Sequence, residues 1–355
     1  MRYYDISIDG GPRWTSHPKG PGQPPDPGAL QVEMDINNVA YGTAVTGDTV
    51  TIWGIPLQQI SQAFDLNRKN VTIRGGMGVG LPLATAQSKN AGILVRATVN
   101  QAFGNWIGTN MYLTLVFTGA PQTATGIAGA ETPDKLVVNW RAGQEMADTL
   151  HSTLSAAFPD YTLDVRIKKG LVLGYDQPGY YSTLWQLAQY TKSASKDIMG
   201  PGYNGVDISV HDKTIRVDDG STGGTAKQIA FTDLIGQPTW LAPTMISVTT
   251  VMRADLHVGD WITLPNTLVT IAPKSSSEFN AIQSFSTARQ NSIFQGQFRV
   301  FGIRHVGNFR SPDGAQWITV LSCSATGQLL GTPADQIQIA PLQPTGLGGK
   351  NPPFN

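Results

Sequence analysis

Apolar and polar residues alternate along much of the N-terminal third, and this period of two predicts β-strands. Val32, Met34 and Ile36 alternate with polar neighbours over residues 30–36. Further strands are predicted over residues 49–53, 70–74, 92–99 and 110–117. A short helix is expected after Pro56, with Leu57, Ile60 and Phe64 on one apolar face. Five strands around one short helix are typical of a small, strongly curved antiparallel sheet or barrel.

Helical periodicity appears in the middle of the chain. A strand over residues 135–140 leads into a helix that Pro159 ends, and a second helix starts at Thr183, where Thr183 and Gln186 have the spacing of a capping box. The apolar stripes of the two helices are Met146, Leu150, Leu154 and Phe158 in the first and Leu184, Leu187 and Ala188 in the second. A strand over 161–167 and a hairpin of 206–210 with 213–217 complete a compact α/β region.

The alternation returns in the last third. Strands are predicted over residues 245–252, 261–264 and 268–272, then a long polar loop over 274–295, and finally a hairpin of 297–306 with 316–324. Residues 331–355 are rich in Pro, Gly and Gln and have no periodicity, so this tail is expected to be extended or disordered, or ordered only on a partner.

These patterns predict a mainly β, α+β chain with four parts. They are a β-domain at 1–120 that contains an irregular Pro/Gly-rich loop at 12–28, an α/β domain at 133–217, a second β-domain at 227–330 and the tail at 331–355.

Composition excludes several classes of function. Lys plus Arg and Asp plus Glu both number 25, so no net charge attracts the chain to nucleic acid or to an acidic membrane. The only cysteine, Cys323, lies in a predicted strand and is expected to be a small core residue, which excludes a disulfide framework. There is neither a signal peptide nor an apolar run long enough to span a bilayer, so a soluble chain without membrane anchoring is expected.

No catalytic, cofactor-binding or metal-binding residue is predicted. The run Gly75–Gly80 is followed by Leu81-Pro82 rather than by Lys-Ser/Thr, so it is a poor phosphate loop. The histidines His17, His151, His211, His257 and His305 lack the spacing of zinc ligands and are expected to contact solvent or to form local hydrogen bonds. Asp255 and Asp260 could form a glycosidase pair, but they are better interpreted as turn and surface acids.

Tryptophans could provide platforms for sugars or single strands, but most of them fall in predicted core positions. Trp53, Trp140, Trp261 and Trp317 lie in or beside alternating strands, and Trp185 is on the second helix. Only Trp14, in the Pro/Gly-rich loop, is a candidate anchor for a partner surface. Lys168 and Lys169 are expected at a solvated strand end.

Three stretches, taken in order, resemble the baseplate hub family of contractile or long phage tails. The first runs from residue 50 to 119 and includes GIPLQQISQAF and NVTIRGGM; the second is LVVNWRAGQEMADTLHSTLSAAF. The third is IAFTDLIGQPTWLAPTMISVTTVMRADLHVGDWITL, followed much later by GQFRVFGIRHVGNFRSPDGAQWITVLSC. The resemblance covers residues 30–325 and leaves the loop at 12–28 without a counterpart.

The resemblance implies two tail-tube-like antiparallel β-barrel domains in each chain and no enzymatic activity. Three chains would form a pseudo-sixfold ring in the virion, assembled in the host cytoplasm. The implied partners are tail tube or distal tail proteins and a central spike or fibre, with DNA passing only transiently through the lumen. The alternatives are another tail-tip component, such as a distal tail or tube-initiator protein, and a carbohydrate-binding or cell-wall-degrading tail protein.

Overall fold

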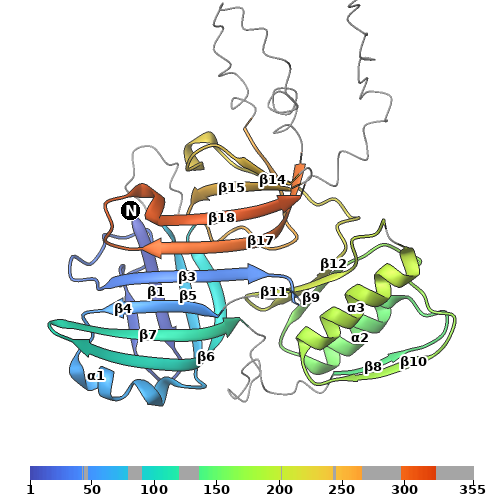
Figure 1. Cartoon of the computed structure of the whole chain (residues 1–355), viewed down its shortest axis with the longest axis horizontal. Helices are drawn as coiled ribbons and strands as arrows, with labels where there is room; N and C mark the ends of the chain where they lie inside the picture. The colour runs from blue at the N-terminus through green and yellow to red at the C-terminus, as the bar shows by residue number, and fades with distance from the viewer. Residues whose placement is uncertain are drawn as a thin grey trace, which may run out of the picture.

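The computed structural model describes residues 1–41, 43, 47–78, 90–119, 136–200, 202–242, 245–265 and 297–324. Most strands in this part of the chain belong to one sheet with the order β14-β15-β18-β17-β3-β4-β7-β6-β5-β1-β2, to which β16 and β13 are joined through β17 (Figure 1). All but one of its strand pairs are antiparallel, and the described part of the chain has few helices. The predicted mainly β, α+β fold class is therefore confirmed.

The N-terminal part of the sheet wraps around its own apolar core. Its strands are β1 (Arg2–Ile8), β2 (Arg13–Thr15), β3 (Gln31–Val39), β4 (Asp48–Trp53), β5 (Asn70–Met77), β6 (Gly92–Ile107) and β7 (Asn110–Gly119). In Figure 1, β1 and β5 lie behind β3, β4 and β7 and run across them. The five predicted strands are present. Sequence patterning missed β1, because its residues Tyr3, Tyr4, Asp5 and Ile6 are all buried and show no alternation.

The predicted helix after Pro56 is shorter than expected, and its predicted buried face is wrong. It is divided into α1 (Leu57–Ser61) and the 3₁₀-helix η1 (Ala63–Leu66). Leu57 and Phe64 are exposed, whereas Ala63 and Leu66 are buried. The change from α to 3₁₀ geometry rotates the later side chains away from the 3.6-residue stripe.

The Pro/Gly-rich loop at 12–28 is also more ordered than predicted, because β2 lies within it and pairs with β1. This pairing turns Trp14 into the N-terminal core, where it is 7% exposed. The prediction that Trp14 anchors a partner surface is therefore wrong.

The middle region has its own core and two small sheets. Its elements are β8 (Leu136–Trp140), α2 (Met146–Ala157), β9 (Thr162–Arg166), β10 (Gln177–Tyr181), α3 (Leu184–Met199), β11 (Asp207–His211) and β12 (Thr214–Asp218). Strand β10 pairs with β8, and β12 lies between β11 and β9. The predicted stripes of both helices are buried, and Thr183 caps α3 by accepting a hydrogen bond from the Gln186 backbone.

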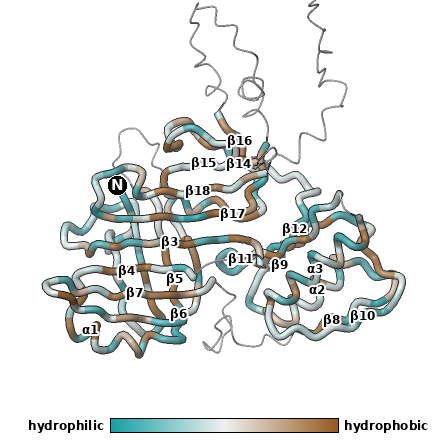
Figure 2. Tube along the Cα trace, viewed as in Figure 1, coloured by the Kyte–Doolittle hydropathy of each residue, from teal (hydrophilic) through white to brown (hydrophobic). Residues whose placement is uncertain are grey.

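The C-terminal part contributes β13 (Lys227–Gln228), η3 (Phe231–Asp233), β14 (Thr239–Ala242), β15 (Met245–Val251), β16 (Trp261–Thr263), β17 (Gln297–Asn308), η5 (Gly314–Gln316) and β18 (Trp317–Ser324). Figure 2 shows hydrophobic and hydrophilic stretches alternating along the strands of the large sheet. The strand predicted at 268–272, the loop at 274–295 and the tail at 331–355 lie outside the described residues.

The two β-rich ends of the chain are joined by the pairing of β3 with β17, from Glu33 opposite Asn308 to Val39 opposite Gly302. A second contact comes from Trp317, which is buried in the N-terminal core and donates from Nε1 to the Gly76 carbonyl at 2.9 Å. Val251, Met252 and Ala254 enter the same core. The two ends thus share both a sheet and part of a core.

This shared core predicts the effect of truncating Trp317. We expect Trp317→Ala to lower the free energy of unfolding by about 3–5 kcal/mol, because it leaves a large cavity and an unpaired carbonyl. Trp317→Phe should cost less, since it keeps most of the packing and loses mainly the hydrogen bond. Urea unfolding measures both, with the exposed Tyr175→Ala as the control. If Trp317→Ala lowered the free energy of unfolding no more than the control does, the result would contradict the shared core.

Candidate functional site

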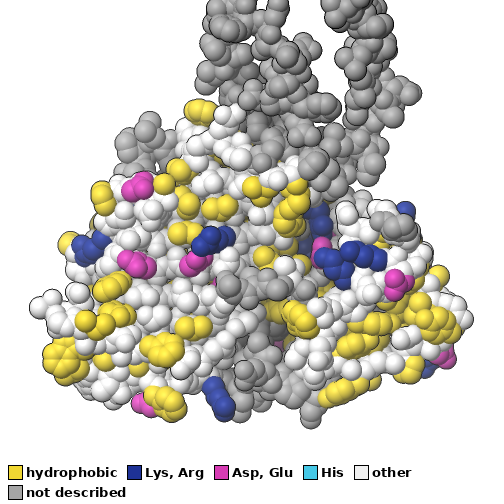
Figure 3. Space-filling model, viewed as in Figure 1, with side chains coloured by type: hydrophobic (Ala, Val, Ile, Leu, Met, Phe, Trp, Pro, Cys, Tyr) yellow, Lys and Arg dark blue, Asp and Glu magenta, His cyan; other side chains and the backbone are white. Residues whose placement is uncertain are grey.

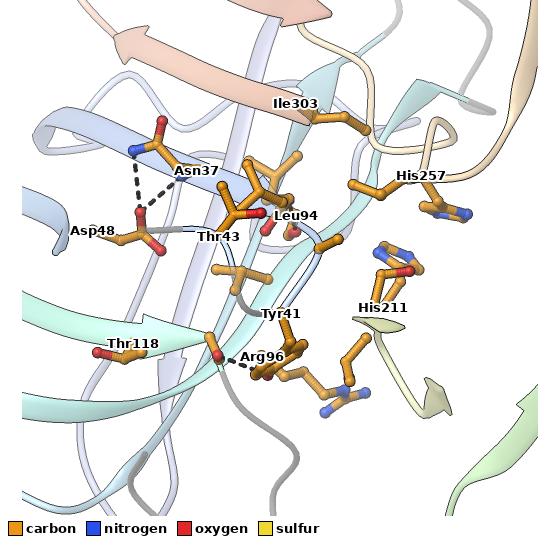
Figure 4. A pocket seen from close by; sticks show the side chains of 18 of the residues that line it. Asn37, Tyr41, Thr43, Asp48, Leu94, Arg96, Thr118, His211, His257 and Ile303 are labelled. Atoms are coloured by element: carbon orange, nitrogen blue, oxygen red, sulfur yellow. Dashed lines mark hydrogen bonds between the residues drawn. The ribbon is translucent and has the colours of Figure 1, made fainter. Parts of the chain in front are cut away.

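A cavity of about 450 Å³ lies where the middle region meets both parts of the large sheet (Figure 4). From the N-terminal part it is lined by the ends of β3, β4, β6 and β7, from the middle region by the start of α3 and the end of β11, and from the C-terminal part by residues 256–258 and Ile303. The wall combines apolar side chains with a small number of polar ones, as ligand pockets usually do.

Asp48 is the buried acid of this cavity. It is the first residue of β4, where the alternation that buries Val50 and Ile52 also turns Asp48 inward, so that it is 6% exposed. Its Oδ1 accepts hydrogen bonds from the Asn37 backbone nitrogen at 2.8 Å and from Asn37 Nδ2 at 3.3 Å. Burial raises the pKa of Asp48 to about 6, although the hydrogen bonds from Asn37 oppose the rise.

Two histidines face each other across the junction. The rings of His211, at the end of β11, and His257, from the C-terminal part, stack with centroids 3.4 Å apart and planes 30° apart. Burial lowers the pKa of His211 to about 3, helped by His257, and lowers that of His257 to about 4 although Asp260 opposes it. Both rings are therefore neutral near pH 7, and two neutral rings can stack without repulsion.

The remaining charges at the cavity are Arg96 and Asp212, which form an ion pair between β6 and the β11–β12 turn. The described lining thus contains two carboxylates, Asp48 and Asp212, and one guanidinium, so it carries one net negative charge near pH 7. In Figure 4, Asp48 and the histidines lie at opposite ends of the cavity, so they do not form an acid–base pair.

The acids considered as a glycosidase pair are both engaged with cations. Asp260 is buried and accepts from Arg216 Nη1 at 2.9 Å and from Lys227 Nζ at 2.7 Å. Burial raises the pKa of Asp260, but Lys227 and the other partners lower it below its usual value. Asp255 pairs with Arg253 at 2.7 Å. The prediction of a surface acid is wrong for Asp260, because this carboxylate joins the middle region to the C-terminal part.

The other histidines lie away from the cavity. His305 is buried and shares a 2.9 Å hydrogen bond with Thr319, and His151 is exposed on α2. His17 shares a 2.8 Å hydrogen bond with Ser16, and both side chains are buried. The Ser16 hydroxyl also forms hydrogen bonds with the backbone of Tyr4. In the described ranges, no group of three or more His, Cys, Asp or Glu side chains could hold a metal ion.

The remaining predictions on single residues have mixed outcomes. Cys323 is fully buried, as predicted, and burial raises the pKa of its thiol. The described part of the glycine run belongs to the end of β5, where Gly76 has φ +140° and a Cβ would lie 2.6 Å from Ala91 Cα. Lys168 and Lys169 are exposed, as predicted. Trp140, Trp261 and Trp317 are buried, Trp53 is half-buried and Trp185 is exposed.

Sequence reasoning missed the two most informative residues, Asp48 and Trp106. Extending the alternation of Val50 and Ile52 by two positions would have placed an acid on the core face. Trp106 is 62% exposed near the end of the long β6–β7 hairpin. Its exposure has no signal in the sequence, because a strand that projects beyond its core has the same local pattern as one that does not.

The raised pKa of Asp48 predicts that Asp48→Asn stabilises the protein at high pH. A carboxyl whose folded pKa is raised contributes stability below its ordinary pKa of 3.8, and this contribution is lost as pH rises through about 6. We expect the free energy of unfolding of the variant to exceed that of the wild type by on the order of 1–3 kcal/mol at pH 8. The reason is that the new Asn side chain still accepts hydrogen bonds from Asn37 and carries no buried charge.

The advantage of Asp48→Asn should shrink toward pH 4, as measured by urea unfolding across the pH range. His211 and His257 have lowered pKa values, so acidification destabilises the wild type and the variant equally through them. Their effect therefore cancels in the difference between the two free energies of unfolding. Asp160→Asn, at an exposed position outside the cavity lining, is the control and should show no such gain. A pH-independent difference for Asp48→Asn would contradict the assignment.

Comparisons with known proteins give distant structural likenesses. No protein-family model and no curated protein matches this chain. The chain is similar to a tail protein from Neisseria meningitidis MC58, with 10% identity and a TM-score of 0.46 over 91% of this chain and 96% of that one. It is also similar to the 43 kDa tail protein of prophage MuSo2 from Shewanella oneidensis, with 7% identity and a TM-score of 0.49 over 91% and 96%. A third likeness, to the structure of a PdpA-VgrG complex, has 7% identity and a TM-score of 0.46 over 92% and 65%. Likeness at this level does not by itself define a function.

Proposed function

We propose that this chain is a non-enzymatic structural subunit of a phage tail, acting as the baseplate hub. The observation that carries the proposal is the pairing of β3 with β17, which sets the two β-rich ends of one chain side by side in a single sheet (Figure 1). A hub of the resembled family requires such an arrangement, and β17 lies in the last of the stretches that resemble it.

The four predicted parts have distinct roles in this proposal. Residues 1–120 and 227–330 are two tube-like building blocks, and the α/β region at 133–217 is attached to their outside. Three chains then supply six blocks around one axis, so the ring matches a sixfold tail tube on one side and a threefold spike or fibre on the other. The tail at 331–355 is proposed to become ordered on a partner.

Exposed apolar side chains provide a surface for association. Beyond Val99, most of β6 is exposed, and the β6–β7 hairpin with α1 and η1 presents an apolar surface made of Leu57, Phe64, Phe103, Trp106 and Ile107. Gly104 allows this close packing, because a Cβ there would lie 2.5 Å from the Ile60 carbonyl oxygen. Hydrophobic side chains gather at the end of the hairpin in Figure 3. Such patches usually mark protein–protein contacts, and we assign this one to a neighbouring chain of the ring.

The ends of the sheet are a second means of association. Among the described strands, β2 and β14 end the main strand order, and β14 is only four residues long. Unpaired strand edges favour pairing with another chain. We propose that edge strands of neighbouring subunits continue the sheet around the lumen. The formal net charge of zero suits a conduit through which DNA passes without being retained.

The site geometry does not favour the enzymatic alternative. Asp255 and Asp260 are both paired with cations, so neither carboxylate is free to act in a glycosidase pair. A distal tail or tube-initiator protein belongs to the same structural class and differs in the number of copies around the axis. In the described part of the chain, no helix is both long and apolar enough to cross a membrane.

The proposal predicts that the purified chain forms a trimer and that Trp106→Ser shifts it toward the monomer. Sedimentation velocity measures this directly. The substitution removes apolar contact area from the proposed interface. Because it is a surface change, it should alter the free energy of unfolding of the single chain by no more than about 0.5 kcal/mol.

Tyr175→Ser is the matched control, because Tyr175 is 61% exposed in the middle region against 62% for Trp106. It should leave the trimer intact. A wild-type chain that stays monomeric, or a hexamer in place of the trimer, would overturn the hub assignment. Imaging of the assembled particle would then show whether the chain lies on the tail axis at the junction of tube and spike.

A further inference from the structure

We propose that the junction cavity binds an organic cation, an alkylammonium or guanidinium group, with the carboxylate of Asp48 as its counter-ion. This inference is independent of the proposed function, since it rests on the geometry of the cavity alone.

The first step is the exceptional position of Asp48 among the buried acids. In the described residues, Asp5, Asp218, Asp233 and Asp260 each have an Arg or Lys nitrogen within 4.0 Å, and Asp219 receives hydrogen bonds on both carboxylate oxygens. Among the described residues, Asp48 has hydrogen bonds only from Asn37, and these reach one oxygen. A buried carboxylate without a cation is expensive, and Asp48 has fewer donors than Asp219, the other buried acid without a cation.

The second step is that the described residues that line the cavity include no unpaired cation. Arg96 lines the wall, but its guanidinium is paired with Asp212 and also donates to Thr72 at 3.3 Å. His211 and His257 are neutral at pH 7 because they are buried. The single net negative charge therefore favours a ligand with one positive charge and disfavours an anion.

The third step is the shape and chemistry of the wall. Asp48 lies at one end of a space of about 450 Å³ and Trp185, which is 44% exposed, lines it from the first turn of α3. Tyr41 and Phe117 add aromatic surface, and Val39, Leu94 and Ile303 add apolar surface. Aromatic faces attract organic cations, and the apolar wall suits the methylene chain that carries such a group.

Two sources can supply this chemistry, a free alkylamine or alkylguanidine, and the side chain of an Arg or Lys on a partner. Isothermal titration calorimetry on the full chain distinguishes them with four probes that each carry one positive charge. They are pentylamine, butylguanidine, N-acetylarginine amide and N-acetyllysine amide. Tighter binding of the free amines indicates a small metabolite, and tighter binding of the blocked amino acids indicates a partner side chain. Pentanol and pentanoate are the neutral and anionic controls.

We expect Asp48→Asn to weaken binding of the cationic probe at least about tenfold, which is the loss of one partly buried charge contact. Asp160→Asn, at an exposed position outside the cavity lining, is the matched control and should bind as the wild type does. Binding to the wild type should also become about tenfold weaker between pH 7.5 and pH 5, as Asp48 takes up a proton.

A second measurement avoids the variant altogether. Carbon-13 NMR of the wild-type carboxyls should show the pKa of Asp48 falling when the cation is added, because a bound positive charge favours the ionised form. The proposal is overturned if no cationic probe binds the wild type. It is equally overturned if Asp48→Asn binds as well as the wild type, if pentanol binds as tightly as the cations, or if the pKa of Asp48 does not move.

Discussion

The structure depends on one long-range interaction, the antiparallel pairing of β3 with β17. It joins residues that are more than 260 positions apart, and closing so long a loop has an entropic cost that only the shared sheet and core offset. Since a shift of one residue in register would turn every side chain to the opposite face, the ladder also fixes what lies on each side of it. Ile36 and His305 are thereby held on the buried face, and Trp317 reaches the carbonyl of Gly76.

The same pairing creates the cavity. The middle region is inserted between the two β-rich ends, so bringing these ends together brings its α3 and β11 against both of them. The ion pair of Arg96 with Asp212 links the N-terminal part to the middle region, and the stacked rings of His211 and His257 link the middle region to the C-terminal part. A three-sided junction cannot be packed as tightly as a single core, because each wall belongs to an element with its own register and its own buried side chains.

Charge is distributed unequally between this cavity and the surrounding framework. Asp164, Arg216, Asp260 and Lys227 form a connected chain of ion pairs from the middle region to the C-terminal part, and Arg299 lies close to Asp207 and Asp218. Removing one member of such a network would leave a buried charge without a partner, so the network favours one relative placement of the parts. Asp48 stands outside it. Among the described buried acids, those of the network are paired with cations, Asp219 has hydrogen bonds on both carboxylate oxygens, and Asp48, with donors on one oxygen alone, lines a cavity.

The sequence by itself determined the class of fold, most strands and both long helices, because alternation, helical stripes and caps are local properties. Thr183 with Gln186 marks the start of α3, and Leu150 with Leu154 marks the buried side of α2. Local patterning failed where burial is decided by distant segments, as for β1, which is covered on both faces, and for Trp14, which is drawn inward by the pairing of β2. Only the tertiary structure decided that the two β-rich ends share a sheet, that His211 meets His257, and that Asp48 lines a cavity in which no described residue forms an ion pair with it. The physical reason is that each of these features depends on contact between two segments far apart in the chain. The local sequence pattern of one segment does not indicate which distant segment it contacts.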